Sequence, residues 1–213
     1  PKVDTDIINE MAERAVKFAS NEKYEGAGTI EFIYDLDEKK FYFLEMNTRI
    51  QVEHPVTETI TNADLVAMQI KFALDLDLDF KEQNEISKYG HAIECRLYAE
   101  DPSKNFLPSP GKILKLRTPN EKYKNIRLDI GVDEGDEISF YYDPMIAKII
   151  SKGADRKESI NNMINYLKDF EIEGINTNKS FLISLLQNKN FEEANFNTKF
   201  IENNLNLIIA KII

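Results

Sequence analysis

The chain has 213 residues and a formal net charge of −10 at pH 7, with 42% hydrophobic and 30% charged residues. This is the balance of an ordinary globular protein, and the negative charge argues against nucleic acid or an anionic membrane surface as the main partner. Cys95 is the single cysteine, so no internal disulfide can form and the cytoplasm is the expected compartment. No apolar run reaches the length of a membrane span.

The first part of the chain reads as a helix, two strands and a second helix. Apolar residues recur at helical spacing after Asp4 or Thr5, either of which is a suitable helix cap. Residues 29–34 (TIEFIY) and 41–46 (FYFLEM) are rich in β-branched and aromatic residues, which is typical of strands. The polar stretch 61–64 (TNAD) predicts the start of another helix.

From Gly90 onward the pattern changes to short strands followed by helices, so the fold class expected for the whole chain is α+β. The polar stretch 79–89 is the natural seam, and it predicts one domain at 1–80 and a second at 81–213. The elements expected in the second domain are strands at 91–98, 112–117 and 138–142, a helix that Asp155 caps, and helices at 177–186 and 198–205.

Residues 43–58 (FLEMNTRIQVEHPVTE) carry polar side chains at alternate positions of an expected strand. Successive side chains of a strand face opposite sides, so the alternate set would line one surface with no apolar residue among them. The members of this set are Glu45, Asn47, Arg49, Gln51 and Glu53.

The two expected strands would pair as a hairpin. A three-residue loop at 37–39 places Glu31 directly opposite Glu45. The same register pairs Phe32 with Leu44. Opposed side chains have Cβ atoms about 5 Å apart, and two carboxylates at that distance repel by about 3 kcal/mol at an effective dielectric near 20.

A bound divalent cation would offset this repulsion. Mg²⁺ takes carboxylate oxygens together with phosphate oxygens and water. Asn47 lies two residues after Glu45 on the same expected face and adds a neutral oxygen. The alternative is a solvated hairpin face with screened glutamates, and the pattern by itself leaves both interpretations open.

Several segments resemble one family of enzymes. The string EMNTRIQVEHPVTE resembles the signature of the biotin carboxylases, which are ATP-grasp ligases that carboxylate biotin. GAGTIEF before it, and GHAIECRLYAEDP, NFLPSPGKI, YYDPMIAKII and GINTN after it, resemble the same family in the same order. The resemblance covers about the C-terminal half of such an enzyme. It implies the C-terminal part of an ATP-grasp domain, with antiparallel strands and helices, followed by the sheet-plus-helices domain at the C-terminus of biotin carboxylases.

This resemblance implies a metal and nucleotide site. Glu31, Glu45 and Asn47 match the residues that bind Mg²⁺ (or Mn²⁺) and the ATP phosphates in that family. Glu31 and Glu45 are therefore expected to contact ATP through the metal as well. The residues expected to line the adenine pocket are Ile33, Leu44 and Ile175.

The resemblance also implies a site for bicarbonate and biotin. Arg49, Gln51 and the backbone of Val52 match the bicarbonate-binding residues, where a guanidinium suits a carboxylate-like anion. Glu53 matches the general base that deprotonates bicarbonate. Arg96 matches the arginine that stabilises the enolate of biotin, so Arg49, Glu53 and Arg96 are the expected catalytic residues.

Each of these residues has a structural interpretation too. Arg96 lies in an alternating strand and could be an exposed partner of Glu94 or Glu100. Glu53 could cap the turn before Pro55.

The remaining notable side chains carry no chemistry in this interpretation. Cys95 would lie on the strand face opposite Arg96, as a core residue. His54 and His91 are interpreted as structural imidazoles. The resemblance places Arg127 and Asp143 near a dimer contact and the rim of the active site.

The implied cofactors and substrates are ATP, Mg²⁺ or Mn²⁺, and carrier-bound biotin. The implied partners are a biotin carboxyl carrier protein, carboxyltransferase subunits and a second copy of the chain. Acetyl-CoA, propionyl-CoA and pyruvate carboxylases share this half-reaction, so the acceptor stays open. Two alternatives are a non-catalytic dimerisation or scaffold domain, and another bicarbonate-activating ATP-grasp ligase of the carbamoyl-phosphate synthetase type. Because the resemblance covers half of an enzyme, we expect the chain to belong to a longer protein and to be inactive alone.

Overall fold

The computed structural model describes residues 3–210, which form two compact units that divide between Ser87 and Lys88. This division lies within the polar stretch 79–89. All strand pairs in the described residues are antiparallel, and helices accompany them in both units, which confirms the α+β class. Within the same residues, no helix has the length and apolar character needed to cross a membrane.

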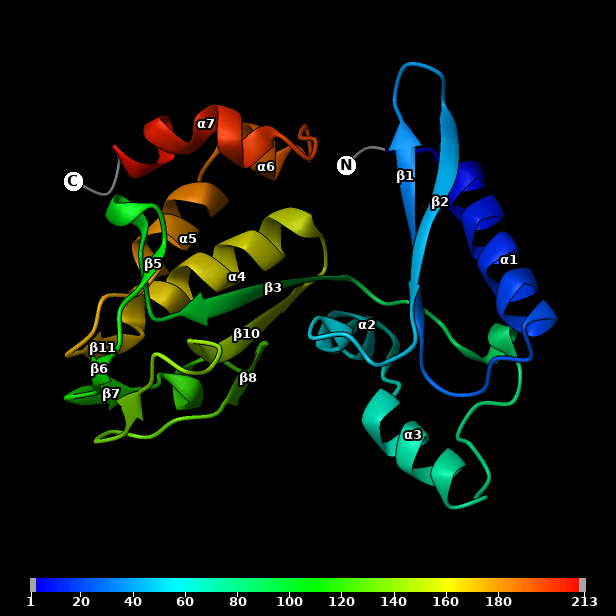
Figure 1. The fold of residues 1–213 in the computed structure, drawn as a ribbon, viewed down its shortest axis with the longest axis horizontal. Helices are drawn as coiled ribbons and strands as arrows, with labels where there is room; N and C mark the ends of the chain where they lie inside the picture. Colours follow the sequence, from blue (N-terminus) through cyan, green and yellow to red (C-terminus); the bar gives the residue numbers. More distant parts are fainter. Residues whose placement is uncertain (1–2, 211–213) are drawn as a thin grey trace. The chain divides into compact units, whose positions relative to one another are not determined.

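The N-terminal unit is built on a hairpin and one long helix. Helix α1 (Thr5–Asn21) lies along one face of the hairpin formed by β1 (Thr29–Asp35) and β2 (Lys40–Asn47) (Figure 1). The Phe18 ring of α1 packs 5.2 Å from the Phe43 ring of β2, measured between centroids. The helix and both strands are close to the segments that the sequence predicts.

The register of this hairpin differs from the predicted one, yet the carboxylate pair is the same. The turn is one residue longer than expected, so Phe32 pairs with Phe43 rather than with Leu44. A β-bulge then leaves Leu44 without a partner in β1, and beyond it Glu31 pairs with Glu45 as predicted. The longer turn and the extra residue in β2 compensate each other.

Two short helices complete the N-terminal unit. Helix α2 (His54–Thr61) was not predicted from the sequence, because its residues were assigned to a strand and a turn. Helix α3 (Leu65–Ala73) begins where the sequence predicts a helix, and the Asp64 carboxylate caps it by accepting a hydrogen bond from the Ala67 amide at 2.8 Å.

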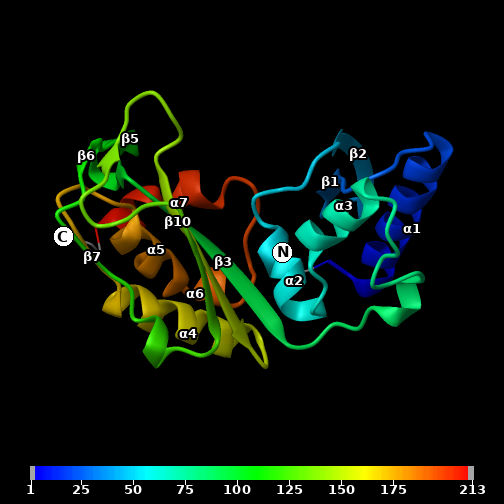
Figure 2. The same ribbon diagram turned by 90° about the horizontal axis from the view of Figure 1, so that it is seen from below.

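The C-terminal unit contains a three-stranded sheet covered on one face by a helix. The strand order is β3 (His91–Tyr98), β10 (Met145–Gly153) and β8 (Ile126–Ile130). Helix α4 (Arg156–Asp169) packs on β3 and β10 (Figures 1 and 2), and the Asp155 carboxylate caps it, as predicted.

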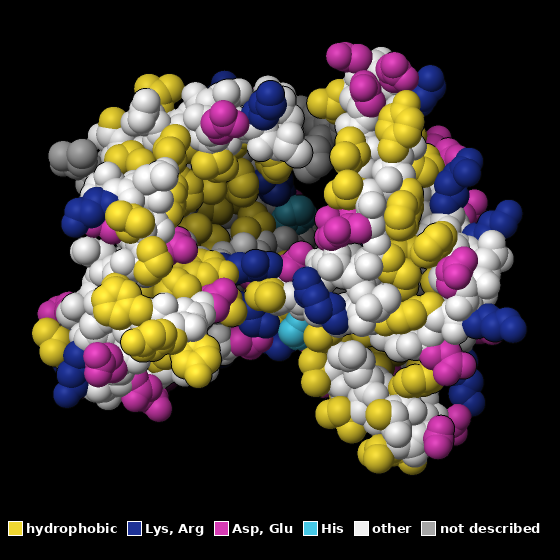
Figure 3. Space-filling view, in the orientation of Figure 1, with side chains coloured by type: hydrophobic (Ala, Val, Ile, Leu, Met, Phe, Trp, Pro, Cys, Tyr) yellow, Lys and Arg dark blue, Asp and Glu magenta, His cyan; other side chains and the backbone are white. Residues whose placement is uncertain are grey.

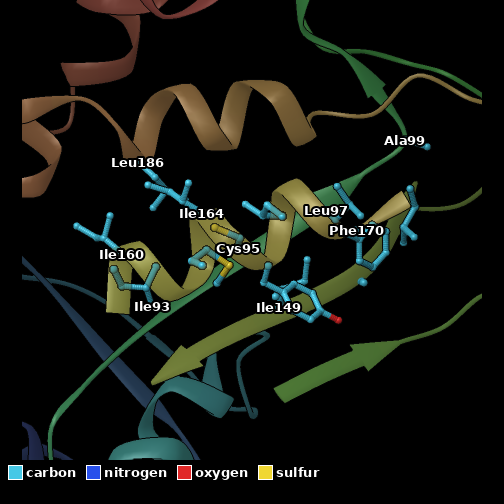
Figure 4. Close-up of a cluster of buried hydrophobic side chains, with 14 of the residues drawn as sticks. Ile93, Cys95, Leu97, Ala99, Ile149, Ile160, Ile164, Phe170 and Leu186 are labelled. Atoms are coloured by element: carbon cyan, nitrogen blue, oxygen red, sulfur yellow. The ribbon is translucent and has the colours of Figure 1, made fainter. Parts of the chain in front are cut away.

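Alternate residues of β3 form the core beneath α4. Figure 4 shows Ile93, Cys95 and Leu97 of β3 directed toward the same apolar cluster as Ile149 of β10 and Ile164 of α4. These five residues are at most 9% exposed. The alternation of residues 91–98 therefore reflects a strand with one buried face and one more polar face, as expected.

Two of the expected strands in this unit are only partly formed. The predicted strand at 112–117 is split between β6 (Gly111–Lys112) and β7 (Lys115–Arg117). The predicted strand at 138–142 is wrong beyond β9 (Glu137–Ile138), which pairs with the two residues of β6. The aromatic residues that follow β9 have high strand propensity but no strand to pair with, and they are exposed.

Short ladders and helices complete the C-terminal unit. Strand β11 (Glu171–Glu173) pairs antiparallel with β7, and β4 (Glu100–Asp101) pairs antiparallel with β5 (Leu107–Pro108). The predicted helices at 177–186 and 198–205 correspond to α5 (Lys179–Leu186) and α7 (Phe200–Ile209). The remaining elements of this unit are α6 (Lys189–Glu192) and 3₁₀ turns at Pro102–Lys104 and Asn120–Lys122, while a 3₁₀ turn at Gln83–Glu85 belongs to the N-terminal unit.

The core position of Cys95 predicts an unreactive thiol. Burial, together with the nearby Glu94 carboxylate, raises the pKa of Cys95 to about 12. The thiolate is the reactive form, so a thiol reagent such as Ellman's reagent at pH 8 should not label the native protein. One thiol per chain should react after denaturation. Rapid labelling of the native chain, measured by absorbance, would contradict this placement.

Candidate active site

The two carboxylates predicted to face each other do converge. Glu31 of β1 lies directly opposite Glu45 of β2. The side-chain amide of Asn47 donates to Glu31 Oε1 at 3.0 Å and to Glu45 Oε1 at 3.0 Å. Both carboxylates therefore lie within reach of one atom, which offsets part of their mutual repulsion.

Arg49 and Gln51 join this cluster without belonging to a strand. The expectation of a continuous strand through Glu53 is wrong, since β2 ends at Asn47 and the chain turns into α2. The Gln51 amide nevertheless donates to Glu31 Oε1 at 3.2 Å. The Arg49 guanidinium lies 3.5 Å from Asn47 Oδ1 and donates to the Ile50 carbonyl at 3.2 Å.

Glu53 occupies the position just before α2. It is the N-cap residue of that helix, with φ −82° and ψ 9°, and its side chain is exposed. The side chain makes no capping hydrogen bond, so the interpretation of Glu53 as a cap gains no support. Val52, which precedes it, is half-buried.

The carboxylate and amide groups of this cluster fit a hard divalent cation that also binds phosphate oxygens. Two converging carboxylates and an amide whose oxygen can turn toward a metal are ligands that Mg²⁺ and Mn²⁺ accept. Within residues 3–210, no three His, Cys, Asp or Glu side chains gather in a way that could hold a metal ion.

Hydrophobic side chains are exposed on the same hairpin (Figure 3). Ile33 is 56% exposed, Tyr42 52% and Leu44 51%. Ile33 follows Glu31 by two residues in β1, so the two share a face of the strand. Ile175 belongs to the C-terminal unit, where it packs partly against the core, and the adenine pocket stays a prediction.

Arg96 lies on the face of β3 opposite Cys95, and its side chain is 39% exposed. It stands directly across from Lys148 of β10, whose ammonium lies 3.4 Å from Asp129 of β8. Its Nε lies 3.8 Å from Glu94 Oε1, so one of the structural partners considered for Arg96 does contact it.

Sequence reasoning missed one pair beside this cluster, His54 and Glu58 of α2. Their ring nitrogen and carboxylate oxygen are 3.9 Å apart, and both side chains are largely buried, at 13% and 9% exposed. The spacing of four residues was the available signal, but it is informative only for a helix, and α2 was not predicted.

The chain belongs to the biotin carboxylase family. A family model described as the biotin carboxylase C-terminal domain matches residues 94–203, which is more than half of the chain. A second, described as the carbamoyl-phosphate synthase L chain, ATP binding domain, matches residues 1–81. The match of residues 94–203 to the biotin carboxylase C-terminal domain favours a biotin carboxylase over a ligase of the carbamoyl-phosphate synthetase type.

Known proteins resemble the chain along nearly all of its length. Biotin carboxylase 1 of Bacillus subtilis is 48% identical over 202 residues, which cover 95% of this chain and 44% of that protein. The human mitochondrial propionyl-CoA carboxylase alpha chain is 44% identical, over 93% of this chain and 27% of its own length. The chain thus spans less than half of the length of these relatives.

A solved structure gives the same result for the fold. The biotin carboxylase domain dimer of the Hydrogenobacter thermophilus 2-oxoglutarate carboxylase, in complex with MgADP, ADP and bicarbonate, is 38% identical with a TM-score of 0.91. The match covers 97% of this chain and 45% of that one.

Proposed function

We propose that this chain is part of a biotin carboxylase, which uses ATP and bicarbonate to carboxylate biotin on a carrier protein. Residues 1–80 would be the C-terminal part of its ATP-grasp domain, and residues 81–213 its C-terminal domain. The observation that carries the proposal is the hydrogen-bonded cluster at the end of the hairpin, in which Glu31, Glu45, Asn47 and Gln51 converge on one another.

In this proposal Glu31, Glu45 and Asn47 hold Mg²⁺ or Mn²⁺ together with the ATP phosphates. The metal, when bound, neutralises charge on the phosphates during transfer of the γ-phosphoryl group. Asn47 now donates its amide to both carboxylates, so the amide would turn to present its oxygen to a metal. Exposed Ile33 and Leu44 are available to the adenine ring. Ile175 is the third residue that the proposal assigns to this ring.

Bicarbonate would bind beside the metal, to Arg49, Gln51 and the backbone of Val52. The Arg49 guanidinium can pair with a planar anion through two parallel hydrogen bonds. The exposed carboxylate of Glu53 would take the proton of bicarbonate, which makes the anion a better nucleophile for the γ-phosphorus. Attack forms carboxyphosphate and releases ADP. Carboxyphosphate then breaks down to CO₂, which biotin takes up, and phosphate, which accepts the ureido proton of biotin.

Arg96 would stabilise the enolate that forms when biotin loses its ureido proton. The guanidinium is a permanent cation, so it can favour the developing oxyanion without a proton transfer of its own. The contact of Arg96 Nε with Glu94 orients the side chain and leaves it partly exposed.

The partners follow from this activity. A biotin carboxyl carrier protein would deliver biotin, and carboxyltransferase subunits would use the carboxylated product. A second copy of the chain would complete a homodimer, with Arg127 near the contact and Asp143 at the site rim. We assign the protein to the cytoplasm. The acceptor, whether acetyl-CoA, propionyl-CoA or pyruvate, is left open.

A chimeric carboxylase tests the proposal. In it, residues 1–213 of this chain replace the matched segment of Biotin carboxylase 1 from Bacillus subtilis, which is 48% identical. The purified chimera should cleave ATP in a reaction that requires bicarbonate and that free biotin accelerates, measured by release of ADP. A chimera that melts cooperatively but cleaves no ATP under these conditions would contradict the proposed function.

The 213-residue chain alone should show no such activity. It corresponds to 44% of Biotin carboxylase 1, and in isolation the side chains proposed for the adenine site are half exposed. We expect ADP release at the level of a blank, and no thermal stabilisation by MgATP. Bicarbonate-dependent ATP cleavage by the isolated chain would show that these residues suffice for the first half-reaction.

A further inference from the structure

The His54 ring bridges the start of helix α2 and the loop that precedes it. His54 Nδ1 lies 2.8 Å from the Gln51 carbonyl oxygen. A carbonyl oxygen can only accept a hydrogen bond, so Nδ1 must carry the proton. The His54 backbone amide also donates to this carbonyl, at 3.2 Å, and Gln51 is thereby held twice by one residue.

The other side of the ring faces a carboxylate that is itself held in place. His54 Nε2 lies 3.9 Å from Glu58 Oε2. The second oxygen of Glu58 accepts a hydrogen bond from the Leu65 amide at 2.7 Å, which ties α2 to the start of α3. With His54 and Glu58 largely buried, the ring has little freedom to turn.

These contacts, together with one to Glu31, hold both the backbone and the side chain of Gln51. Its carbonyl is held by His54, and its side-chain amide donates to Glu31 Oε1 at 3.2 Å. We propose that His54 is a positioning residue for bicarbonate: it sets the conformation of residues 49–53, the loop to which the proposed function assigns the anion and its base. This inference rests on that function, since a residue can position a ligand only where the ligand binds.

Two substitutions at His54 separate positioning from general support of the fold. In His54→Asn the side-chain amide nitrogen takes the place of Nδ1 and can still donate to the Gln51 carbonyl. In His54→Gln the amide nitrogen takes the place of Nε2, so the contact with Glu58 is kept and the bond to Gln51 is lost. The two variants are therefore matched controls for each other.

We expect the chimeric carboxylase with His54→Gln to show a KM for bicarbonate raised by about tenfold, the effect of one lost hydrogen bond to a constrained group. The KM for MgATP should stay close to that of the unsubstituted chimera. In the separate variant His54→Asn, which keeps the bond to Gln51, the KM for bicarbonate should stay within about threefold of the unsubstituted value. Equal losses in both variants, with every kinetic constant affected alike and a lower Tm, would overturn the proposal.

A second measurement uses the 213-residue chain and does not depend on activity. Its sequence has two histidines, so ¹⁵N spectra of the imidazole rings can be assigned with a His91→Gln variant. At alkaline pH the neutral ring of His54 should be the Nδ1–H tautomer. The Nε2–H tautomer would mean that the bond to Gln51 is absent, and would overturn the inference. An inactive unsubstituted chimera would instead count against the proposed function.

Discussion

Glu45→Gln in the chimeric carboxylase should abolish ATP cleavage, with kcat/KM for MgATP lower by at least about 100-fold, since it removes one of the two charged ligands assigned to the metal. The amide is nearly the same size as the carboxylate, so packing of the hairpin is unchanged. The loss should appear in the bicarbonate-dependent reaction whether or not biotin is added. ADP release at saturating and limiting MgATP measures it.

The stability of the same variant should change in the opposite direction. Without metal, the like charges of Glu31 and Glu45 face each other across the hairpin and repel, an effect that solvent weakens because Glu45 is exposed. The Tm of the metal-free Glu45→Gln protein should therefore be equal to or higher than that of the unsubstituted protein, while the rise in Tm on adding MgATP should disappear. Glu38→Gln, in the exposed turn of the same hairpin, is the matched control and should leave both measurements unchanged. Full activity of Glu45→Gln would remove this residue from the metal site.

Glu53→Gln and Arg96→Gln should affect different stages of the reaction. Biotin carboxylases can cleave ATP slowly when bicarbonate is present and biotin is absent. Glu53→Gln should depress this activity and the biotin-dependent one together, because deprotonation of bicarbonate precedes both. Arg96→Gln should lower the biotin-dependent rate by roughly 10²–10³-fold, the typical effect of losing one oxyanion partner, and should spare the biotin-independent rate.

ADP release with and without free biotin distinguishes the two variants. Arg117→Gln, an exposed arginine of β7 in the same unit as Arg96, controls for the loss of a positive charge and should be close to the unsubstituted chimera. Equal damage to both activities by Arg96→Gln would overturn the division of roles. A Glu53→Gln chimera that still cleaves ATP without biotin would exclude Glu53 as the base.

Local patterns in the sequence were sufficient for elements whose stability comes from local chemistry or from one clear face. Helix α4 follows from the Asp155 cap and its apolar spacing. Strand β3 follows from strict alternation, which also places Cys95 and Arg96 on opposite faces. The opposition of Glu31 and Glu45 was likewise predictable, although the turn length assumed for it was wrong by one residue.

Other features depend on partners that are distant in sequence. Strand β10 is the central strand of its sheet, with buried residues on both faces, so it lacks the alternation by which β3 was found. Residues 140–142 have the composition of a strand, but a strand needs a neighbour to satisfy its backbone, and the ladder with β6 ends at Ile138.

The candidate site likewise combines features that the sequence predicts with features that depend on tertiary contacts. The sequence by itself determined which side chains are candidates, through the types and spacing of Glu45, Asn47, Arg49 and Gln51 and through their resemblance to the biotin carboxylase signature. Only the tertiary structure decided how they meet. The bulge at Leu44 returns Glu45 to its place opposite Glu31, and the turn into α2 brings Gln51 back to Glu31. Such meetings depend on hydrogen bonds between distant segments, such as that from the Gln51 amide to Glu31, which no periodicity in the sequence records.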